Sequence, residues 1–170
     1  MKKNKKNTYI TIGILFVVAA IVIAIGIGTI LKPAKNIPTY PNVLKAGSDP
    51  VQLYKSMQCG CCGVYVNYLK NAVGDRIQVT DVTDIAETKN QYHIPKDMES
   101  CHTTVIGDYV IEGHVPIEAI NKLLSEKPNI VGIAMPGMPS GSPGMPGSKS
   151  GDFVIYAIHK DSSTSEFMRI

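Results

Sequence analysis

Three of the chain's four cysteines lie within residues 59–62, which read Cys-Gly-Cys-Cys. A strand-like run, 51–57, precedes this turn, and a helix-like run, 64–73, follows it. The free N–H groups and positive dipole at a helix N-terminus stabilise thiolates. Thiolates bind soft metals and attack disulfides, so the turn indicates one of these two chemistries. Free cysteines are often buried as small hydrophobic residues, but three of them beside glycines argue against that interpretation.

The chain carries a second group of metal-capable side chains in Ser100-Cys101-His102, about 40 residues further on. It lies just before a predicted hairpin, in which 103–106 and 109–113 are strands and Gly107-Asp108 forms the turn.

The elements that must position these groups follow a recognisable order. A strand at 76–82 has alternating apolar residues, and a helix is expected from about 84, with a capping-box start, to Tyr92, before Pro95. Pro116 opens an amphipathic helix, 117–127, and 153–159 with 165–168 predicts a terminal hairpin. The order predicts an α/β, thioredoxin-like domain with an extra C-terminal β-hairpin. Cys101 and His102 would occupy the place that in this fold normally holds a cis-proline facing the active cysteines.

Four sulfurs and an imidazole in one pocket would form a soft, electron-rich site. We therefore expect metal ligation by Cys59, Cys61, Cys62, Cys101 and His102. Soft thiolates select Cu(I), zinc or iron–sulfur clusters. Adjacent cysteines are awkward for one tetrahedral zinc ion, for which C-x(2–4)-C is the usual spacing, whereas thiolates bridging several Cu(I) ions tolerate adjacency.

Other residues are weaker ligand candidates. His114 stands at the turn after the hairpin, where it either binds the metal or bonds the backbone. The Pro- and Gly-rich segment 134–147 cannot form regular helix or strand. Its thioethers, which favour Cu(I), line a metal pocket or merely cover the core; they are Met135, Met138 and Met145. His93 and His159 are expected to be structural or exposed.

The N-terminus predicts a membrane anchor. Residues 7–31 are uncharged and mostly apolar, which is long enough to span a bilayer. Four lysines within 1–6 make that stretch a cytoplasmic basic tail and place the rest of the chain outside the cytoplasm, in the periplasm or at the cell exterior. A cleaved signal peptide is the alternative, but the apolar run is too long and the segment after it is a poor cleavage site.

The remaining chain divides into a proline-containing linker, 32–50, and one domain, 51–170. Residues 36–170 hold 11 Lys and Arg against 14 Asp and Glu, a net charge of −3. The basic character of the whole chain therefore comes from the membrane flank and gives no reason to expect nucleic-acid binding.

Disulfide chemistry is the competing interpretation. Cys59 and Cys62 have redox C-x-x-C spacing, so Cys59 could be an exposed nucleophile and Cys62 the resolving thiol of an oxidoreductase. A third interpretation is a structural tether in which Cys101 pairs with one of the other three, which leaves odd thiols over.

Four motifs in order give a family resemblance: Cys-Gly-Cys-Cys-Gly, Ser-Cys-His-Thr, Tyr-Val-Ile-Glu-Gly-His-Val-Pro and the Met-Pro-Gly segment. Over residues 50–170 the chain resembles CopG-type copper-resistance proteins, a domain long labelled as of unknown function. The resemblance implies a thioredoxin-like fold, Cu(I) in a thiolate-bridged cluster, and copper handling with possible redox activity. Tyr65 stands where members often have Trp, and a retained anchor is also a departure.

The leading hypothesis is thus a membrane-anchored, extracytoplasmic protein that holds Cu(I) in a Cys/His thiolate site for copper resistance or trafficking. Its partners would be copper ions and a copper exporter, chaperone or copper enzyme at the membrane. A thiol–disulfide or copper-linked oxidoreductase that uses Cys59 and Cys62 is the alternative.

Overall fold

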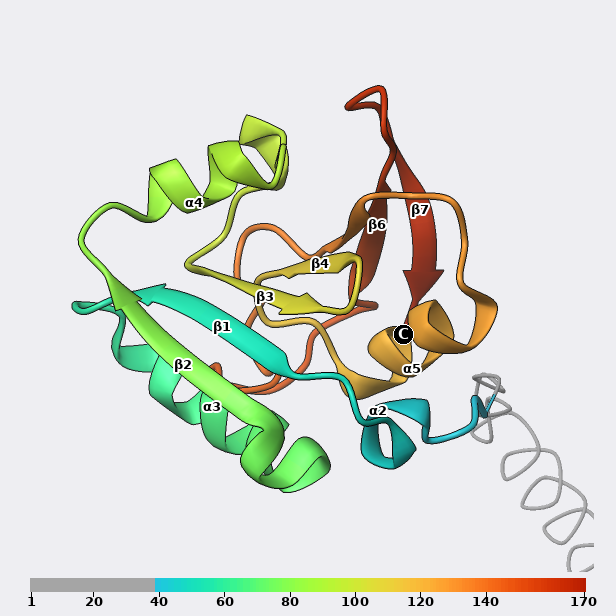
Figure 1. Ribbon diagram of the computed structural model, residues 1–170, viewed down its shortest axis with the longest axis horizontal. Helices are drawn as coiled ribbons and strands as arrows, with labels where there is room; N and C mark the ends of the chain where they lie inside the picture. Colours follow the sequence, from blue (N-terminus) through green and yellow to red (C-terminus); the bar gives the residue numbers. More distant parts are fainter. Residues whose placement is uncertain (1–38) are drawn as a thin grey trace, which may run out of the picture. The chain divides into compact units, whose positions relative to one another are not determined.

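The computed structural model describes residues 39–170, which form a mixed α/β domain built on one seven-stranded sheet (Figure 1). The strands are β1 Val51–Ser56, β2 Ile77–Val82, β3 His102–Ile106, β4 Tyr109–Glu112, β5 Gly132–Ala134, β6 Val154–Ile158 and β7 Thr164–Arg169. The α-helices are α2 Val43–Ala46, α3 Gly60–Val73, α4 Ile85–Gln91 and α5 Ile117–Glu126, and two short 3-10 helices are η1 Gly74–Arg76 and η2 Lys96–Met98.

The strand order is β2-β1-β3-β4-β5-β6-β7. Two pairs, β1 with β2 and β4 with β5, are parallel, and the other neighbours are antiparallel. In the β1–β3 pair, Lys55 lies opposite His102. The end of β1 therefore lies beside the beginning of β3, and both open onto the same edge of the sheet.

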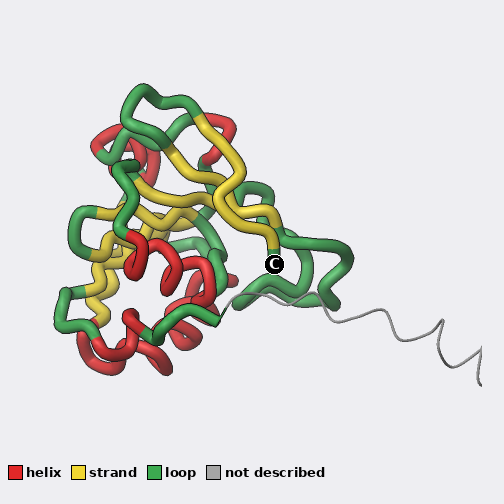
Figure 2. Tube along the Cα trace, turned by 90° about the vertical axis from the view of Figure 1, so that its right-hand side faces the viewer, coloured by secondary structure: helices red, strands yellow, loops and turns green. Residues whose placement is uncertain are grey.

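The sheet is covered on both faces, and its strands alternate accordingly. Ile111, Ile133 and Ile155 are fully buried and pack with the apolar faces of α3 and α5. Their neighbours Val110 and Ala134 point the other way, into a smaller cluster near the end of α4. Figure 1 shows α3 and α5 on one side and α4 on the other, and the turned view in Figure 2 shows the strands as a twisted layer between them. Alternation with a period of two produces this two-sided burial.

Two helix starts illustrate how local sequence positions the domain. Pro116 is the N-cap of α5, and the buried residues of this helix are Ala119, Ile120, Asn121 and Leu123. Ile120 and Leu123 belong to the apolar face that the spacing predicts. The helix α3 begins at Gly60, four residues before the expected start at 64, with Cys59 as its N-cap. Its buried residues include Tyr65 and Leu69. The cysteine turn is therefore the first turn of the helix itself.

The expectation of a thioredoxin-like domain with an extra terminal hairpin was wrong. The finding that overturns it is β5, which is parallel to β4 and antiparallel to β6, so the hairpin of β6 and β7 continues one seven-stranded sheet. The strand β5 is only three residues long and precedes a run of Pro and Gly. Three residues are too few to show alternation, and this is why sequence periodicity missed the strand.

The fold-class prediction also included a transmembrane helix. Within residues 39–170 no helix is long and apolar enough to cross a membrane. The stretch 7–31, on which that prediction falls, lies outside the described residues. Within the segment expected as linker, α2 packs on α5: Leu44 is buried, and its N–H donates to Asn121 Oδ1 at 2.9 Å.

Candidate metal centre

The cysteine turn places three sulfurs around the start of α3. Cys59 has extended backbone angles and no side-chain capping bond, and its N–H donates to Ser56 O at 3.1 Å. Cys61 and Cys62 follow in the first turn, where helix N–H groups lack intrahelical acceptors. Cys62 is buried, while Cys59 and Cys61 remain partly accessible. This position favours the thiolate form of an exposed sulfur.

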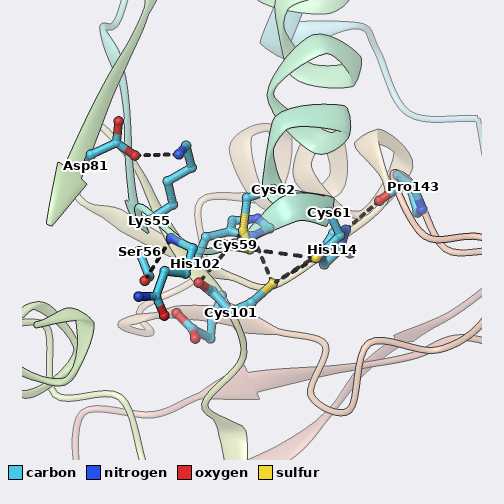
Figure 3. Close-up of a disulfide and its surroundings, with 12 residues drawn as sticks. Lys55, Ser56, Cys59, Cys61, Cys62, Asp81, Cys101, His102, His114 and Pro143 are labelled. Carbon is cyan, nitrogen blue, oxygen red and sulfur yellow. Dashed lines mark hydrogen bonds and ion pairs between the residues drawn. A yellow bond between two sulfur atoms is a disulfide. The ribbon is translucent and has the colours of Figure 1, made fainter. Parts of the chain in front are cut away.

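Cys59 and Cys62 are joined as a disulfide, with 5.5 Å between their Cα atoms (Figure 3). Cys61 and Cys101 are free thiols. The structural-tether hypothesis, in which Cys101 is cross-linked, therefore does not describe this structure. The C-x-x-C pair predicted from spacing forms instead, because residues 59 and 62 lie about one helical turn apart.

The second segment meets this turn because β3 runs antiparallel to β1. The end of β1 leads into the cysteine turn, and the start of β3 carries Cys101 and His102. Cys61 Sγ lies 3.7 Å from Cys59 Sγ and 4.0 Å from Cys101 Sγ. Cys62 Sγ lies 3.9 Å from the carbonyl oxygen of Cys101. The approach predicted from the order of elements is therefore present, although no cis peptide bond occurs among the described residues.

Two imidazoles flank Cys101 on its other side. Its Sγ lies 3.3 Å from His102 Nδ1 and 3.1 Å from His114 Nε2 (Figure 3). His114 Nδ1 lies 2.7 Å from the carbonyl oxygen of Pro143, which can only accept, so Nδ1 carries the proton and Nε2 presents its lone pair to the centre. Metal-binding imidazoles are commonly oriented by such an acceptor on their other ring nitrogen, and the Pro143 carbonyl orients His114 in the same way.

Two overlapping groups of possible ligand atoms result. Within each group, all ligand atoms lie within 4.8 Å of one another: Cys59, Cys61, Cys62 and Cys101 in the first, and Cys101, His102 and His114 in the second. Cys101 belongs to both groups. The arrangement can bind a soft metal through the cysteine sulfurs, and the two imidazole nitrogens can act as further ligands.

Tyr65 forms the floor of the centre. Its ring centroid lies 4.5 Å from that of His102 and 5.2 Å from that of His114, and its hydroxyl donates to Val115 O at 2.9 Å. Tyr65 is fully buried, and burial raises the pKa of its phenol well above the usual range. A neutral aromatic wall that excludes water strengthens electrostatic interactions inside the site.

Burial keeps the Cys101 thiol and the two imidazoles uncharged in the metal-free protein. Burial, with the nearby Cys61 sulfur, raises the pKa of the Cys101 thiol to about 12. Burial, with His114 and Lys89 as further causes, lowers the pKa of His102 to about 3. Burial also lowers the pKa of His114, and its contact with Pro143 opposes that shift. Neutral imidazoles are ready to ligate, whereas the Cys101 thiol must release a proton when a metal binds.

The segment that carries Met135, Met138 and Met145 covers the centre, but these side chains do not all lie toward it. Residues 135–153 contain turns and bends and neither helix nor strand, as expected for this part of 134–147, whereas Ala134 is the last residue of β5. Met135 is buried in the hydrophobic core, which fits the interpretation of a core-covering side chain. Met138 is 38% exposed, and Met145 is partly buried. The segment reaches the centre through Pro143 and through Gly144, where an added Cβ would lie 2.8 Å from the Tyr65 backbone nitrogen.

Among the other sequence candidates, His93 is exposed and His159 bonds Ser165 Oγ through Nε2 at 2.8 Å, and neither belongs to the two ligand groups. Sequence reasoning missed the buried ion pair of Lys89 and Glu112 behind the centre. The only signal for it was Glu112 at the end of an otherwise apolar strand, and a charged residue there is equally typical of an exposed position.

Known proteins share sequence and structure with this chain. The family model described as "Protein of unknown function, DUF411" matches residues 98–145, which contain Cys101, His102 and His114. No curated protein matches the chain. Two solved structures are similar: copper resistance protein CopG form 1 and form 2, each 32% identical. The matches cover 71% and 73% of this chain and 96% and 99% of those chains, with TM-scores of 0.61 and 0.63.

These matches span nearly the whole of both CopG chains and most of the domain described here. They agree with the resemblance inferred from the four motifs, and the cysteine and histidine side chains of those motifs are the ones that meet in the centre. Together with this metal-capable cluster, they give the protein a copper-related function. The chain belongs to the CopG copper-resistance family.

Proposed function

We propose that this protein binds Cu(I) through Cys59, Cys61, Cys62 and Cys101, with His102 and His114 completing the site, and that it holds or relays copper for resistance. The observation that carries the proposal is the gathering of four sulfurs and two imidazoles from three elements around Cys101. Such convergence of soft ligands in one partly buried centre favours Cu(I) over hard cations.

The geometry also supports more than one copper ion. Cys61 and Cys62 are adjacent, and Cys101 Sγ lies within 4.0 Å of Cys61 Sγ and 3.1 Å of His114 Nε2. A thiolate with neighbours on two sides can bridge two ions, whereas one tetrahedral zinc site has no use for six converging groups. Met138 and Met145 remain candidates for auxiliary thioether contacts from the covering segment.

The disulfide sets the condition for copper binding. Cys59 and Cys62 cannot supply two thiolates while they are bonded to each other. Reduction takes two electrons and two protons and yields two thiols, after which all four sulfurs are available. The reduced protein should therefore bind more Cu(I), and bind it more tightly, than the oxidised protein.

The proposal includes a place of action outside the cytoplasm, at a membrane. It is supported by the uncharged stretch 7–31 and the lysines before it. A copper exporter, chaperone or copper enzyme in that membrane would be the exchange partner. A membrane-impermeant thiol reagent applied to intact, reduced cells tests the location: labelling of the four cysteines supports it, and labelling only after lysis contradicts it.

The binding test compares reduced and oxidised protein under anaerobic conditions. Free-thiol counting should give two thiols before reduction and four after it. Reduced protein titrated with Cu(I) against a competing chelator should retain copper, whereas a variant with all four cysteines changed to serine should not. Equal copper content in the two proteins would contradict the proposal.

A second candidate function is thiol–disulfide exchange, favoured by the Cys59–Cys62 disulfide at a helix N-terminus. Cys59 is the more accessible sulfur and Cys62 the buried one, as an attacking and a resolving thiol would be. Insulin reduction that is lost in Cys59→Ser but kept in Cys101→Ser would support this function. No turnover with any dithiol reductant would exclude it.

A further inference from the structure

A fully enclosed ion pair lies behind the metal centre. Lys89, on α4, contacts Glu112 Oε1 with its Nζ, and their side chains are 2% and 0% exposed. Helix α4 packs against β1 and β3, on the side of the sheet away from α3 (Figure 1). Neither residue is a member of the two ligand groups, so the pair is outside the site described so far.

The Glu112 carboxylate accepts hydrogen bonds from the residues on both sides of the Cys101-His102 segment. Its Oε1 accepts from the Ser100 N–H at 2.6 Å, and its Oε2 accepts from the Thr103 hydroxyl at 2.7 Å. Lys89 Nζ also lies 3.4 Å from Thr103 Oγ1. The two residues that bracket the ligand segment are therefore both tied to one carboxylate.

The strand that carries Glu112 continues directly to the other imidazole. Gly113 N–H donates to His102 O at 3.0 Å, and His114 follows. Gly113 has a φ of +80° and lies so close to Ser100 that an added Cβ would be 2.7 Å from Ser100 Oγ. Glu112 thus lies between the two segments that carry Cys101, His102 and His114, and it contacts or adjoins both of them.

A contribution to the stability of the fold does not by itself explain why this ion pair is buried. Two buried charges lose their hydration, and an apolar pair of similar volume is often as stable or more stable. Burial raises the pKa of Glu112, while Lys89, Thr103 and the Ser100 amide oppose the rise. The carboxylate is instead aimed at three donors, two of which belong to residues next to the ligands.

We infer that Glu112, held by Lys89, is a positioning residue for the metal centre: it fixes Cys101 and His102 in ligating geometry without touching the metal. The inference rests on the proposed function for its copper readout. Removing the hydrogen-bond partners of metal ligands commonly lowers metal affinity by roughly 10–100-fold.

Two double variants separate positioning from folding. Lys89→Met with Glu112→Leu removes both charges and every bond to Ser100 and Thr103. Lys89→Met with Glu112→Gln also removes both charges, but the amide can still accept from the Ser100 N–H and donate to Thr103 Oγ1. Lys122→Met with Glu126→Gln removes a partly exposed ion pair on α5, far along the chain from the ligand segment, and serves as the charge control.

The first readout is Cu(I) affinity of the reduced full-length chain, measured by chelator competition, with thermal unfolding recorded in parallel. The Leu-containing variant should bind about 10–100-fold more weakly than the unaltered protein. The Gln-containing variant and the α5 control should stay within about threefold. Full affinity in a folded Leu-containing variant would overturn the inference, as would equal losses in the Leu- and Gln-containing variants.

The second readout needs no copper. Trypsin places Cys101 in the fragment 97–122 and the other cysteines in 56–70, so their alkylation rates can be followed separately in one metal-free, reduced sample. Alkylation of Cys101 should accelerate several-fold in the Leu-containing variant, with little change in 56–70. Unchanged rates in both fragments would contradict positioning. If Cys101 alkylation accelerates but even the unaltered protein binds no Cu(I), the proposed function fails and the positioning role stands.

A conservative variant covers the case in which the Leu-containing protein does not fold. Thr103→Val keeps the side-chain shape and removes the hydroxyl bond to Glu112 Oε2 together with the longer contact to Lys89 Nζ. It should accelerate Cys101 alkylation and weaken Cu(I) binding by a smaller factor than the double variant. Thr104→Val, whose hydroxyl has no partner in the described part of the chain, is the matched control and should change neither.

Discussion

At the residue scale, Cys101 is the centre of the arrangement. It lies within 4.0 Å of Cys61 Sγ on one side and within 3.3 Å of two imidazole nitrogens on the other. Its thiol is held protonated by burial and by its neighbouring sulfur, since its pKa is raised to about 12. A metal must displace that proton, so copper binding and proton release are coupled at this residue.

His102 gives a prediction about acid stability. Its pKa is lowered to about 3 in the folded protein, mainly by burial, against an ordinary value near 6.5. Between these values the unfolded chain binds a proton that the folded chain does not, so the free energy of unfolding falls as the pH falls. The expected contribution is about 1.4 kcal/mol per pH unit.

Urea unfolding of reduced, metal-free protein between pH 7 and pH 4 measures this slope. His102→Gln, which cannot titrate, should lose that part of the pH dependence while keeping a polar side chain. Parallel pH dependences in the two proteins would show that His102 is protonated in the folded state.

At the element scale, the site depends on how β1, β3 and β4 are joined. The antiparallel pairing of β1 with β3 brings the start of β3 to the cysteine turn. The turn after β4 then folds back so that Gly113 N–H bonds His102 O. These connections at one edge of the sheet therefore place the cysteine and histidine ligand candidates.

Gly113 tests this junction, with Gly137 as its matched control. Both glycines have a φ of +80°, which strains any residue with a Cβ, but only Gly113 has neighbours in the way: Ser100 and the Met135 carbonyl. Gly137→Ala should cost about 1–3 kcal/mol from backbone strain alone. Gly113→Ala should cost a further 1–3 kcal/mol or so from overpacking.

Chemical unfolding of the two variants gives the difference. Gly113→Ala should also lower Cu(I) affinity, because the added methyl group pushes on Ser100, next to Cys101, whereas Gly137→Ala should not. Equal destabilisation of the two variants would mean that the segment around Ser100 moves aside without resistance.

At the scale of the whole molecule, the described domain holds its own core. Residues 38–170 form one compact unit. Its two apolar clusters, one on each face of the sheet, are built from residues within this unit. Both ligand groups also belong to it entirely.

A chain reduced to residues 38–170 should therefore fold and bind Cu(I) as the full-length protein does. A single cooperative unfolding transition and an unchanged copper content per chain are the expected measurements. A shorter chain that begins at Val51 removes α2 and the Leu44 contact with Asn121, and it should be less stable. Loss of copper binding in the 38–170 chain would show that the N-terminal unit takes part in the site.

Much of the domain could be predicted because its signals are local. A strand-like run predicted β1, alternation predicted β2, the turn at Gly107 predicted the hairpin of β3 and β4, and Pro116 with apolar spacing predicted α5. The strand β5 was missed because three residues carry no periodicity, and its absence from the prediction turned a seven-stranded sheet into a smaller domain with an added hairpin. The fold class was wrong for that reason.

The sequence by itself determined that Cys59, Cys61 and Cys62 share one helix start and that Cys59 and Cys62 can form a disulfide, because spacing along a helix sets these distances. The order of the elements also predicted that Cys101 and His102 approach this turn. Only the tertiary structure decided which further groups join them. Strand pairing and burial bring Cys101 to His114 and place the Pro143 carbonyl on the other nitrogen of that imidazole. They also bring Glu112, paired with Lys89, into a hydrogen bond with Ser100. These contacts join residues far apart in the chain, and no local pattern encodes them.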